Sequence, residues 1–195
     1  IMTVADNGNL LIDPADGSTW LYVYEKRPQQ RLKKILYWQN KWALFSDDAL
    51  DLSARLMKDD WGINSHTLDA TWHWQFSPKL SFEPHYRFYR QSAADFYRPF
   101  LRTGEEIDVS GSTITALVDN ASSDGRLAAF SARTVGLRMD YRLSEETGLS
   151  LRLEHYQQYD ENKQLAVAAG SDLAGMQQFA PLAANWIQAG FVTRW

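Results

Sequence analysis

The stretch Thr67–Phe76 alternates strictly between apolar and polar residues, and this alternation limits the folds that the chain can adopt. Successive side chains of a β-strand point to opposite faces, so residues two apart share a face. Two tryptophans two positions apart on one face need a very deep protein core or a lipid bilayer. The apolar set is Leu68, Ala70, Trp72, Trp74 and Phe76, and the polar set is Thr67, Asp69, Thr71, His73 and Gln75.

The same period of two recurs in six other segments of the 195-residue chain, which predicts about seven strands. These segments are long enough for a tilted strand to cross a membrane, which takes roughly 9–11 residues. No window approaches the ~18 consecutive apolar residues of a membrane helix, and the mean hydropathy is −0.42. The six segments are 31–45, 50–58, 80–91, 133–143, 149–158 and 185–195.

Short and long connections alternate between these segments. The stretches 46–49, 77–79 and 144–148 are short and rich in turn residues, whereas 92–132 and 159–184 are long. Outer-membrane barrels have this layout, with short periplasmic turns and long extracellular loops. The sequence therefore predicts an all-β fold, an antiparallel transmembrane β-barrel of the bacterial outer membrane in contact with its lipid. A soluble β-sandwich or lipocalin-like barrel is the alternative, and the loop asymmetry argues against it.

The carboxyl end carries an aromatic residue after a glycine-containing strand. Gly190, Phe191 and Trp195 resemble the terminal signal that the bacterial barrel-assembly machinery reads, although Thr193 stands where that signal is usually apolar. This pattern predicts a periplasmic carboxyl terminus at the end with the short turns.

Seven strands are an odd number, whereas single-chain bacterial barrels have an even one. Thr19–Glu25 (TWLYVYE) offers an eighth strand. The alternative, which we favour, makes residues 1–30 an extracellular loop or partial strand, and residues 31–195 part of a larger barrel.

Charged side chains share the face opposite the apolar one, and we expect them to line the lumen. Both signs occur on neighbouring strands, so cross-strand pairs are expected. They form either a charged constriction that selects solutes or a brace for the wall. A site of His73, Glu83 and His85 can be drawn, but no metal is predicted. The lumen-facing candidates are Arg55, Asp69, His73, Glu83, His85, Arg87, Arg138, Asp140, Arg142, Arg152 and Glu154.

Two loop motifs stand out at the end with the long loops. The first favours a tight turn, because Gly62 tolerates a positive φ and aspartates bond to turn backbone; a cation or partner site is the second interpretation. The second opens the longest loop and suits burial or docking. The candidates are Asp59, Asp60, Trp61, Gly62 and His66 in the first motif and Gln91, Ser92, Asp95 and Tyr97 in the second.

Several functions are not expected. The net charge of −4 gives no basic surface for nucleic acid, and there is no cysteine. Adjacent Ser65 and His66 point to opposite faces of a strand, which is poor geometry for a nucleophile and its base. No phosphate-binding loop, dinucleotide fingerprint or zinc-protease motif occurs. We predict neither an enzyme nor a cofactor.

Four stretches resemble an uncharacterised family of bacterial outer-membrane barrels, the domain of unknown function numbered 3570. They are EKRPQQR (25–31), DDWGINSHTLD (59–69), YRQSAADFYRPF (89–100) and the closing strand. Gln29–Gln30 departs from the small polar pair expected there. The resemblance implies that this chain is a carboxyl-terminal half, and that an envelope lipoprotein or redox protein is a partner.

The function expected from these patterns is a porin-like or transport-related channel with a charged lumen. The alternative is a non-conducting scaffold barrel that holds an envelope partner. Paired charges and inserted loops would favour the scaffold, and unpaired like charges would favour the channel.

Overall fold

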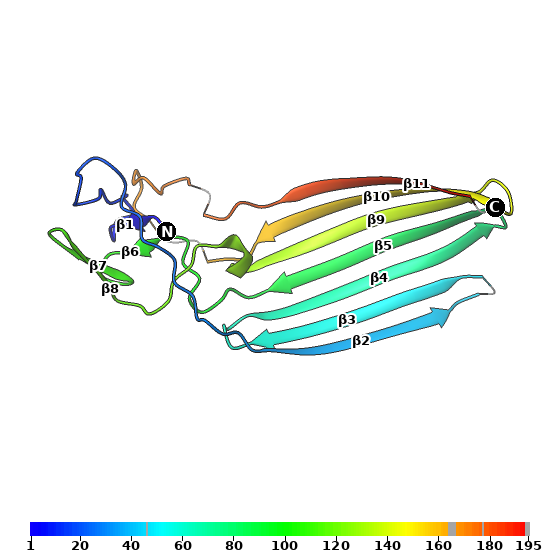
Figure 1. The fold of residues 1–195 in the computed structure, drawn as a ribbon, viewed down its shortest axis with the longest axis horizontal. Coiled ribbons are helices and arrows are strands. Elements are labelled where there is room, and N and C mark those ends of the chain that lie inside the picture. Colours follow the sequence, from blue (N-terminus) through cyan, green and yellow to red (C-terminus); the bar gives the residue numbers. More distant parts are fainter. Residues whose placement is uncertain (46, 164–166, 177, 194–195) are drawn as a thin grey trace.

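One large antiparallel sheet dominates the computed structural model, which describes residues 1–45, 47–163, 167–176 and 178–193 (Figure 1). The prediction of an all-β antiparallel fold is confirmed. The strand order is β11-β10-β9-β5-β4-β3-β2, so every neighbouring pair except β5–β9 is consecutive in the chain. The seven strands are β2 (Lys33–Ala43), β3 (Ala49–Asp59), β4 (Asn64–Ser77), β5 (Leu80–Gln91), β9 (Phe130–Arg142), β10 (Thr147–Asp160) and β11 (Ala183–Thr193).

The sheet is open, and no closed barrel forms within the described part of the chain. Strands β2 and β11 form its two edges. Residues 19–25 do not supply an eighth strand of this sheet; Trp20 and Tyr22 form only isolated bridges, to Ile12 and Met2. A strand inside a sheet satisfies its backbone groups on both sides, and the two edges leave one side of β2 and of β11 unpaired.

The β2–β3, β4–β5 and β9–β10 turns lie at one end of the sheet, whereas the long connections and the short β3–β4 turn lie at the other (Figure 1). The turn between β9 and β10 lies at the first end, where Thr147 pairs with Thr193 of β11. Trp195 lies outside the described residues, so its predicted place beside the short turns is not described.

The long connections and the β3–β4 turn fold together into a cap, which we define as the described residues within 1–32, 60–63, 92–129 and 161–182. It contains two small sheets and one turn of 3-10 helix. The elements are β1 (Thr3–Val4) paired with β6 (Leu101–Arg102), β7 (Ile107–Ser110) paired with β8 (Thr113–Ala116), and η1 (Gly125–Leu127).

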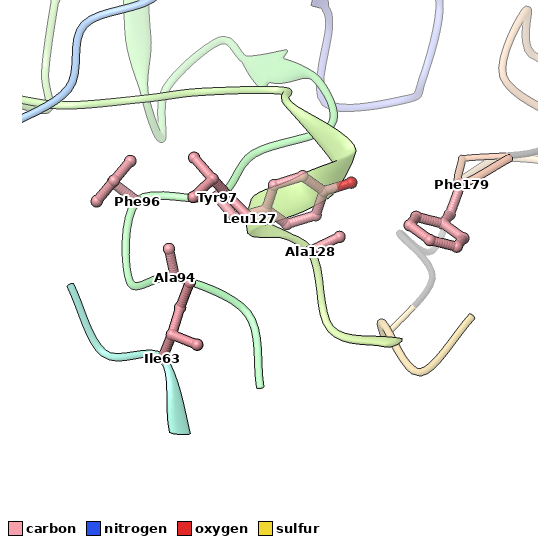
Figure 2. Close-up of a cluster of buried hydrophobic side chains, with 7 residues drawn as sticks. All are labelled: Ile63, Ala94, Phe96, Tyr97, Leu127, Ala128 and Phe179. Atoms are coloured by element: carbon pink, nitrogen blue, oxygen red, sulfur yellow. The ribbon is translucent and has the colours of Figure 1, made fainter. Parts of the chain in front are cut away.

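The cap has a hydrophobic core of its own. One cluster brings the β3–β4 turn against the loops that follow β5 and β10 (Figure 2). A second cluster of Leu101, Ile107 and Ala121 lies further from the sheet and packs against Ile1 and Val23. The first cluster contains Ile63, Ala94, Phe96, Tyr97, Leu127, Ala128 and Phe179.

The large sheet has one apolar and one polar face, as the strict alternation in its strands requires. Trp72 stacks on Trp74 with ring centroids 5.5 Å apart, and Trp74 also contacts Phe82 of the neighbouring strand. The register aligns such residues in rows across the sheet. In one row, Leu153 of β10 pairs with Leu137 of β9 on one side and with Ile187 of β11 on the other. The apolar face is therefore continuous across all seven strands.

Candidate functional site

The polar face of the sheet is the first part of the candidate site. The register places all eleven predicted lumen-facing residues on this one face, opposite Trp72 and Trp74. Arg55 and Asp69 lie on β3 and β4, and the others follow on β4, β5, β9 and β10. Because the sheet is open, the structure defines a polar face and not a lumen.

His85 is the centre of a side-chain network on this face. Its Nε2 atom lies 3.2 Å from Oδ2 of Asp69 on β4, and its Nδ1 atom lies 3.0 Å from Oε1 of Glu154 on β10. The imidazole thus links two carboxylates that belong to strands on either side of β5. Arg87 adds a longer contact of 3.7 Å to the same Asp69 oxygen. The His85 side chain is only 16% exposed, so these contacts are partly shielded from water.

Gly136 makes the contact between β5 and β10 geometrically feasible. Strand β9 lies between them, and Gly136 is its residue at this level, paired with both His85 and Glu154. A Cβ atom on Gly136 would lie 2.8 Å from Cγ of Glu154. The missing side chain therefore leaves the gap through which His85 and Glu154 meet. A glycine inside a strand pattern was the sequence signal for this close approach.

Further ion pairs of alternating sign extend the network along the sheet. Arg152 donates to Oε1 of Glu154 at 2.6 Å, and Arg138 donates to Oδ1 of Asp140 at 2.8 Å. Glu83 lies 3.5 Å from His73 and 3.9 Å from Arg138. Positive and negative groups thus neighbour one another across β4, β5, β9 and β10. This part of the polar face is consequently a charge-compensated wall.

The second part of the candidate site is the junction between the cap and the sheet, and buried Asp59 organises it. Its Oδ1 atom accepts the backbone N–H groups of Trp61 and Ile63, which closes the β3–β4 turn. Its Oδ2 atom accepts Nε and Nη2 of Arg31 at 2.8 and 2.5 Å. The Arg31 guanidinium lies 4.6 Å from the Trp61 ring centroid, in a cation–π contact. A single carboxylate therefore fixes the turn and the entry into β2.

Gly62 brings the second loop motif against this turn. Its φ is +85°, and a Cβ atom there would collide with the carboxylate of Asp95. Ser92 Oγ donates to the Gly62 carbonyl and accepts the Asn64 N–H, and the Asp95 N–H donates to the Trp61 carbonyl. The predicted turn role of Gly62 agrees with this geometry, and the two motifs form one contact.

Gln91 fastens the loop after β5 to the helical turn of the cap. Its buried Nε2 donates to the carbonyls of Arg126 and Ala128 at 3.0 and 2.7 Å, and its Oε1 accepts the Tyr89 hydroxyl. The second motif is thereby tied to η1 as well as to the β3–β4 turn.

The remaining candidates of the two motifs lie in different surroundings. Tyr97 is buried in the first hydrophobic cluster. Asp60 lies at the surface, and its Oδ1 atom accepts a hydrogen bond from the Leu32 N–H. His66 lies on the apolar face of β4, apart from this junction.

Glu25 forms a third anchor, on the outer side of the cap. It accepts hydrogen bonds from the Ser122 hydroxyl, from the Ser123 N–H and hydroxyl, and from Arg27. Partial burial opposes ionisation, but these donors outweigh it and lower the pKa of Glu25 to about 2. Arg27 also lies 3.1 Å from Asp124, whose pKa is lowered to about 2, chiefly by its hydrogen bond from Arg126.

A cavity separates the polar face from the cap. The strands contribute Arg87, Tyr89 and Tyr156, and the cap contributes Arg126 and Phe179. Two aromatic contacts border it, with ring centroids 5.5 Å apart for Tyr89–Phe130 and 6.2 Å apart for Phe130–Phe179. Tyrosines, arginines and an aromatic stack in one concave site suit a polar organic ligand.

The structure also shows where sequence reasoning was incomplete. It did not single out Arg31, Glu25, Gly136 or Tyr156, although Glu25 and Arg31 are the first and last residues of the quoted segment EKRPQQR. Gly190 pairs with Ser150 and Phe191 with Leu149 near the short turns, which leaves their proposed role in assembly a prediction. Within the described ranges, no cluster of three potential metal ligands occurs, and no helix there is long and apolar enough to span a membrane.

The fold defines an all-β protein with a two-faced antiparallel sheet and a cap joined to it by an arginine–aspartate pair. The chain belongs to the family described as a protein of unknown function (DUF3570), whose model matches residues 3–187. That match covers most of the sheet, the junction and nearly all of the cap. No curated protein and no solved structure matches the chain significantly.

Proposed function

We propose that this chain forms part of the wall and the extracellular cap of an outer-membrane β-barrel. The main support for this proposal is the distribution of carboxylates between the two faces of the sheet. Within the seven described strands, no Asp or Glu occupies the apolar face. All seven acidic residues of those strands lie on the polar face: Asp51, Asp59, Asp69, Glu83, Asp140, Glu154 and Asp160.

The apolar face matches a bilayer in extent. From Leu68 to Phe76 it runs roughly 27 Å along β4, at ~3.4 Å per residue. Outer-membrane barrels carry an outward apolar band of about 25 Å, bordered by aromatic residues. Many of its large side chains are exposed, including Ile187 at 73% and Phe191 at 63%. Exposure of this kind over seven strands is unfavourable in water, because apolar patches of that size associate.

Strand direction bears on how such a barrel closes. Strands β2 and β11 both run from the cap toward the short turns (Figure 1). Antiparallel closure between them therefore requires an odd number of further strands, which makes the total even, as in single-chain bacterial barrels. We propose that other parts of the protein supply these strands.

Within the barrel proposal, the polar face favours the scaffold function over the channel. The charges around His85 are paired with neighbours of opposite sign, and the cap is packed by two hydrophobic clusters. The cap also exposes aromatic side chains, among them Tyr22 at 61% and Tyr24 at 98%. Exposed aromatic residues are common in contact surfaces, so we propose that the barrel holds an envelope partner there.

The channel remains the second candidate, and the cavity below the cap favours it. Arg87, Tyr89 and Tyr156 would line a path from this cavity along the polar face. Neutralising Arg87 would then alter ion selectivity, because a charged constriction sets selectivity.

Single-channel conductance of the full-length protein in a planar bilayer tests the two functions. The scaffold function predicts no discrete conductance steps from a correctly folded protein. Discrete steps whose selectivity changes in Arg87→Gln and Arg138→Gln would establish the channel. Tyr24→Ser is the matched control for conductance, since Tyr24 lies on the outer cap away from the polar face.

A further inference from the structure

A basic groove lies on the apolar face of the sheet, close to the cap. Lys34 of β2 and Lys58 of β3 are direct cross-strand neighbours, and Lys58 pairs in turn with Asn64 of β4. The next row toward the short turns contains Leu56 of β3, which pairs with Leu36 of β2 on one side and with His66 of β4 on the other. The groove is lined by these six side chains together with backbone of the three strands.

The two lysines have no acidic partner in the described part of the chain. No carboxylate there lies within salt-bridge distance of Lys34 or Lys58, whereas three arginines of the polar face are joined to carboxylates. Like charges directly opposite each other in a sheet are destabilising. The two lysines lie side by side on a face whose described strands carry no carboxylate. This arrangement favours the binding of a negatively charged group from another molecule.

Other cations continue this pattern along the cap end of the apolar face. Arg90 of β5 is the cross-strand partner of His66, and Arg133 of β9 pairs with Phe88. Arg90 contacts Glu161 of the cap at 2.8 Å, and Arg133 lies 5.5 Å from the Tyr159 ring centroid. In the seven described strands, all lysines and arginines of the apolar face lie at the end near the cap. The positive charges thus border the apolar band on one side.

We infer that the groove of Lys34, Lys58, Asn64 and His66 binds the phosphate group of a phosphorylated glycolipid in the outer leaflet. The inference rests on the proposed membrane function, because it requires the apolar face to contact lipid. The lysine ammonium groups bind the phosphate, and the Asn64 amide, which donates one N–H to the Gly62 carbonyl at 3.3 Å, adds its second N–H. Leu36 and Leu56 lie directly below, where the acyl chains of the same lipid begin. A soluble phosphate compound would leave these leucines without a partner.

Native mass spectrometry of the full-length protein tests this site, after reconstitution into phosphatidylcholine vesicles that contain lipid A. We expect the wild-type protein to retain lipid A, and Lys34→Gln/Lys58→Gln to retain it about thirtyfold less. That expectation follows from roughly one kcal/mol per basic residue near an anionic surface. The matched control is Lys33→Gln/Lys41→Gln, which removes the same charge from the polar face of β2 and should retain lipid A fully.

Comparison of lipids identifies the ligand. Lipid A without phosphate should be retained as weakly by the wild-type protein as intact lipid A is by Lys34→Gln/Lys58→Gln. Equal retention of phosphatidylglycerol and lipid A would overturn the assignment to a glycolipid, and equal lipid A retention by both double variants would overturn the site.

Membrane insertion is measured separately by extraction of the vesicles with alkaline carbonate. Release of the protein would overturn the proposed function together with this inference. Stable insertion without any effect of the lysine substitutions would overturn this inference alone.

Discussion

The cap and the large sheet are built from one chain, yet they bury apolar surface in opposite ways. The described residues include fourteen buried hydrophobic side chains, and only Ala132 among them belongs to the large sheet. The cap thus resembles a small water-soluble domain that shields its apolar groups with its own loops. The sheet instead holds its strands by backbone ladders and leaves its apolar residues exposed. The cap therefore buries its own apolar surface, whereas no other part of the described chain covers the apolar face of the sheet.

The largest expected effect concerns the junction. Asp59→Ala leaves the Arg31 guanidinium without its buried carboxylate and leaves two turn N–H groups unpaired. We expect the free energy of unfolding to fall by about 3 to 5 kcal/mol, which is the range for breaking a buried ion pair. Urea unfolding of the protein in detergent micelles, followed by tryptophan fluorescence, measures it. Asp60→Ala is the control and should cost less than about 1 kcal/mol, because Asp60 is exposed.

The second prediction tests the environment of the sheet. Leu137 lies on the apolar face and is 43% exposed. In a bilayer, Leu137→Lys should cost about 2 to 4 kcal/mol near the midplane, whereas in water a surface substitution stays within about 0.5 kcal/mol. Gln39→Lys, on the polar face beside Asp51, should be tolerated. Equal unfolding free energies for the two variants in lipid would contradict a membrane-facing sheet.

The third prediction separates backbone strain from close packing in the cap. Gly62→Ala introduces both a positive-φ alanine and a collision with the Asp95 side chain, so we expect a cost of about 2 to 3 kcal/mol. Gly104 has a φ of +80°, but a Cβ atom there would meet no other group within 4 Å, so Gly104→Ala should cost only about 1 kcal/mol. The unfolding free energies of the two variants in detergent micelles, each relative to the wild type, measure the difference. Equal losses in both variants would show that the contact with Asp95 contributes nothing.

The smallest effect concerns pH and the outer side of the cap. Because the pKa of Glu25 is lowered to about 2, its anchor stabilises fully above pH ~4.5 and weakens as the pH falls toward 2. Allowing for solvent screening, we expect the free energy of unfolding to fall by about 1 kcal/mol over this pH range. The exchange protection factors of the Lys26 and Ala121 amides, which bond to each other's carbonyls, should be lower at pH 3 than at pH 6. Glu25→Gln should lower these protection factors at pH 6 as well, and Glu105→Gln, outside this contact, should not.

The sequence was most informative about the sheet, for a physical reason. Alternation is a local property of a strand, so the segment 80–91 coincides with β5 and the apolar set of Thr67–Phe76 lies on one face. The cap could not be foreseen in the same way. Its contacts join residues far apart in the chain, such as Glu25 with Ser123 or Arg27 with Asp124, and no sequence periodicity indicates them. The Asp59–Arg31 pair was predictable only in part. Both residues stand in recognisable motifs, but their contact forms only in the folded turn.

The two open edges of the sheet have a consequence for biogenesis. Strands β2 and β11 each present a row of unsatisfied N–H and carbonyl groups over eleven residues. Flat, unprotected edges of this length recruit further strands without regard to their origin, which leads to aggregation. Under the proposed barrel function, a newly made chain would need protection from its own copies until both edges are paired. The same edges that make the sheet extendable also let two copies of the chain pair with each other.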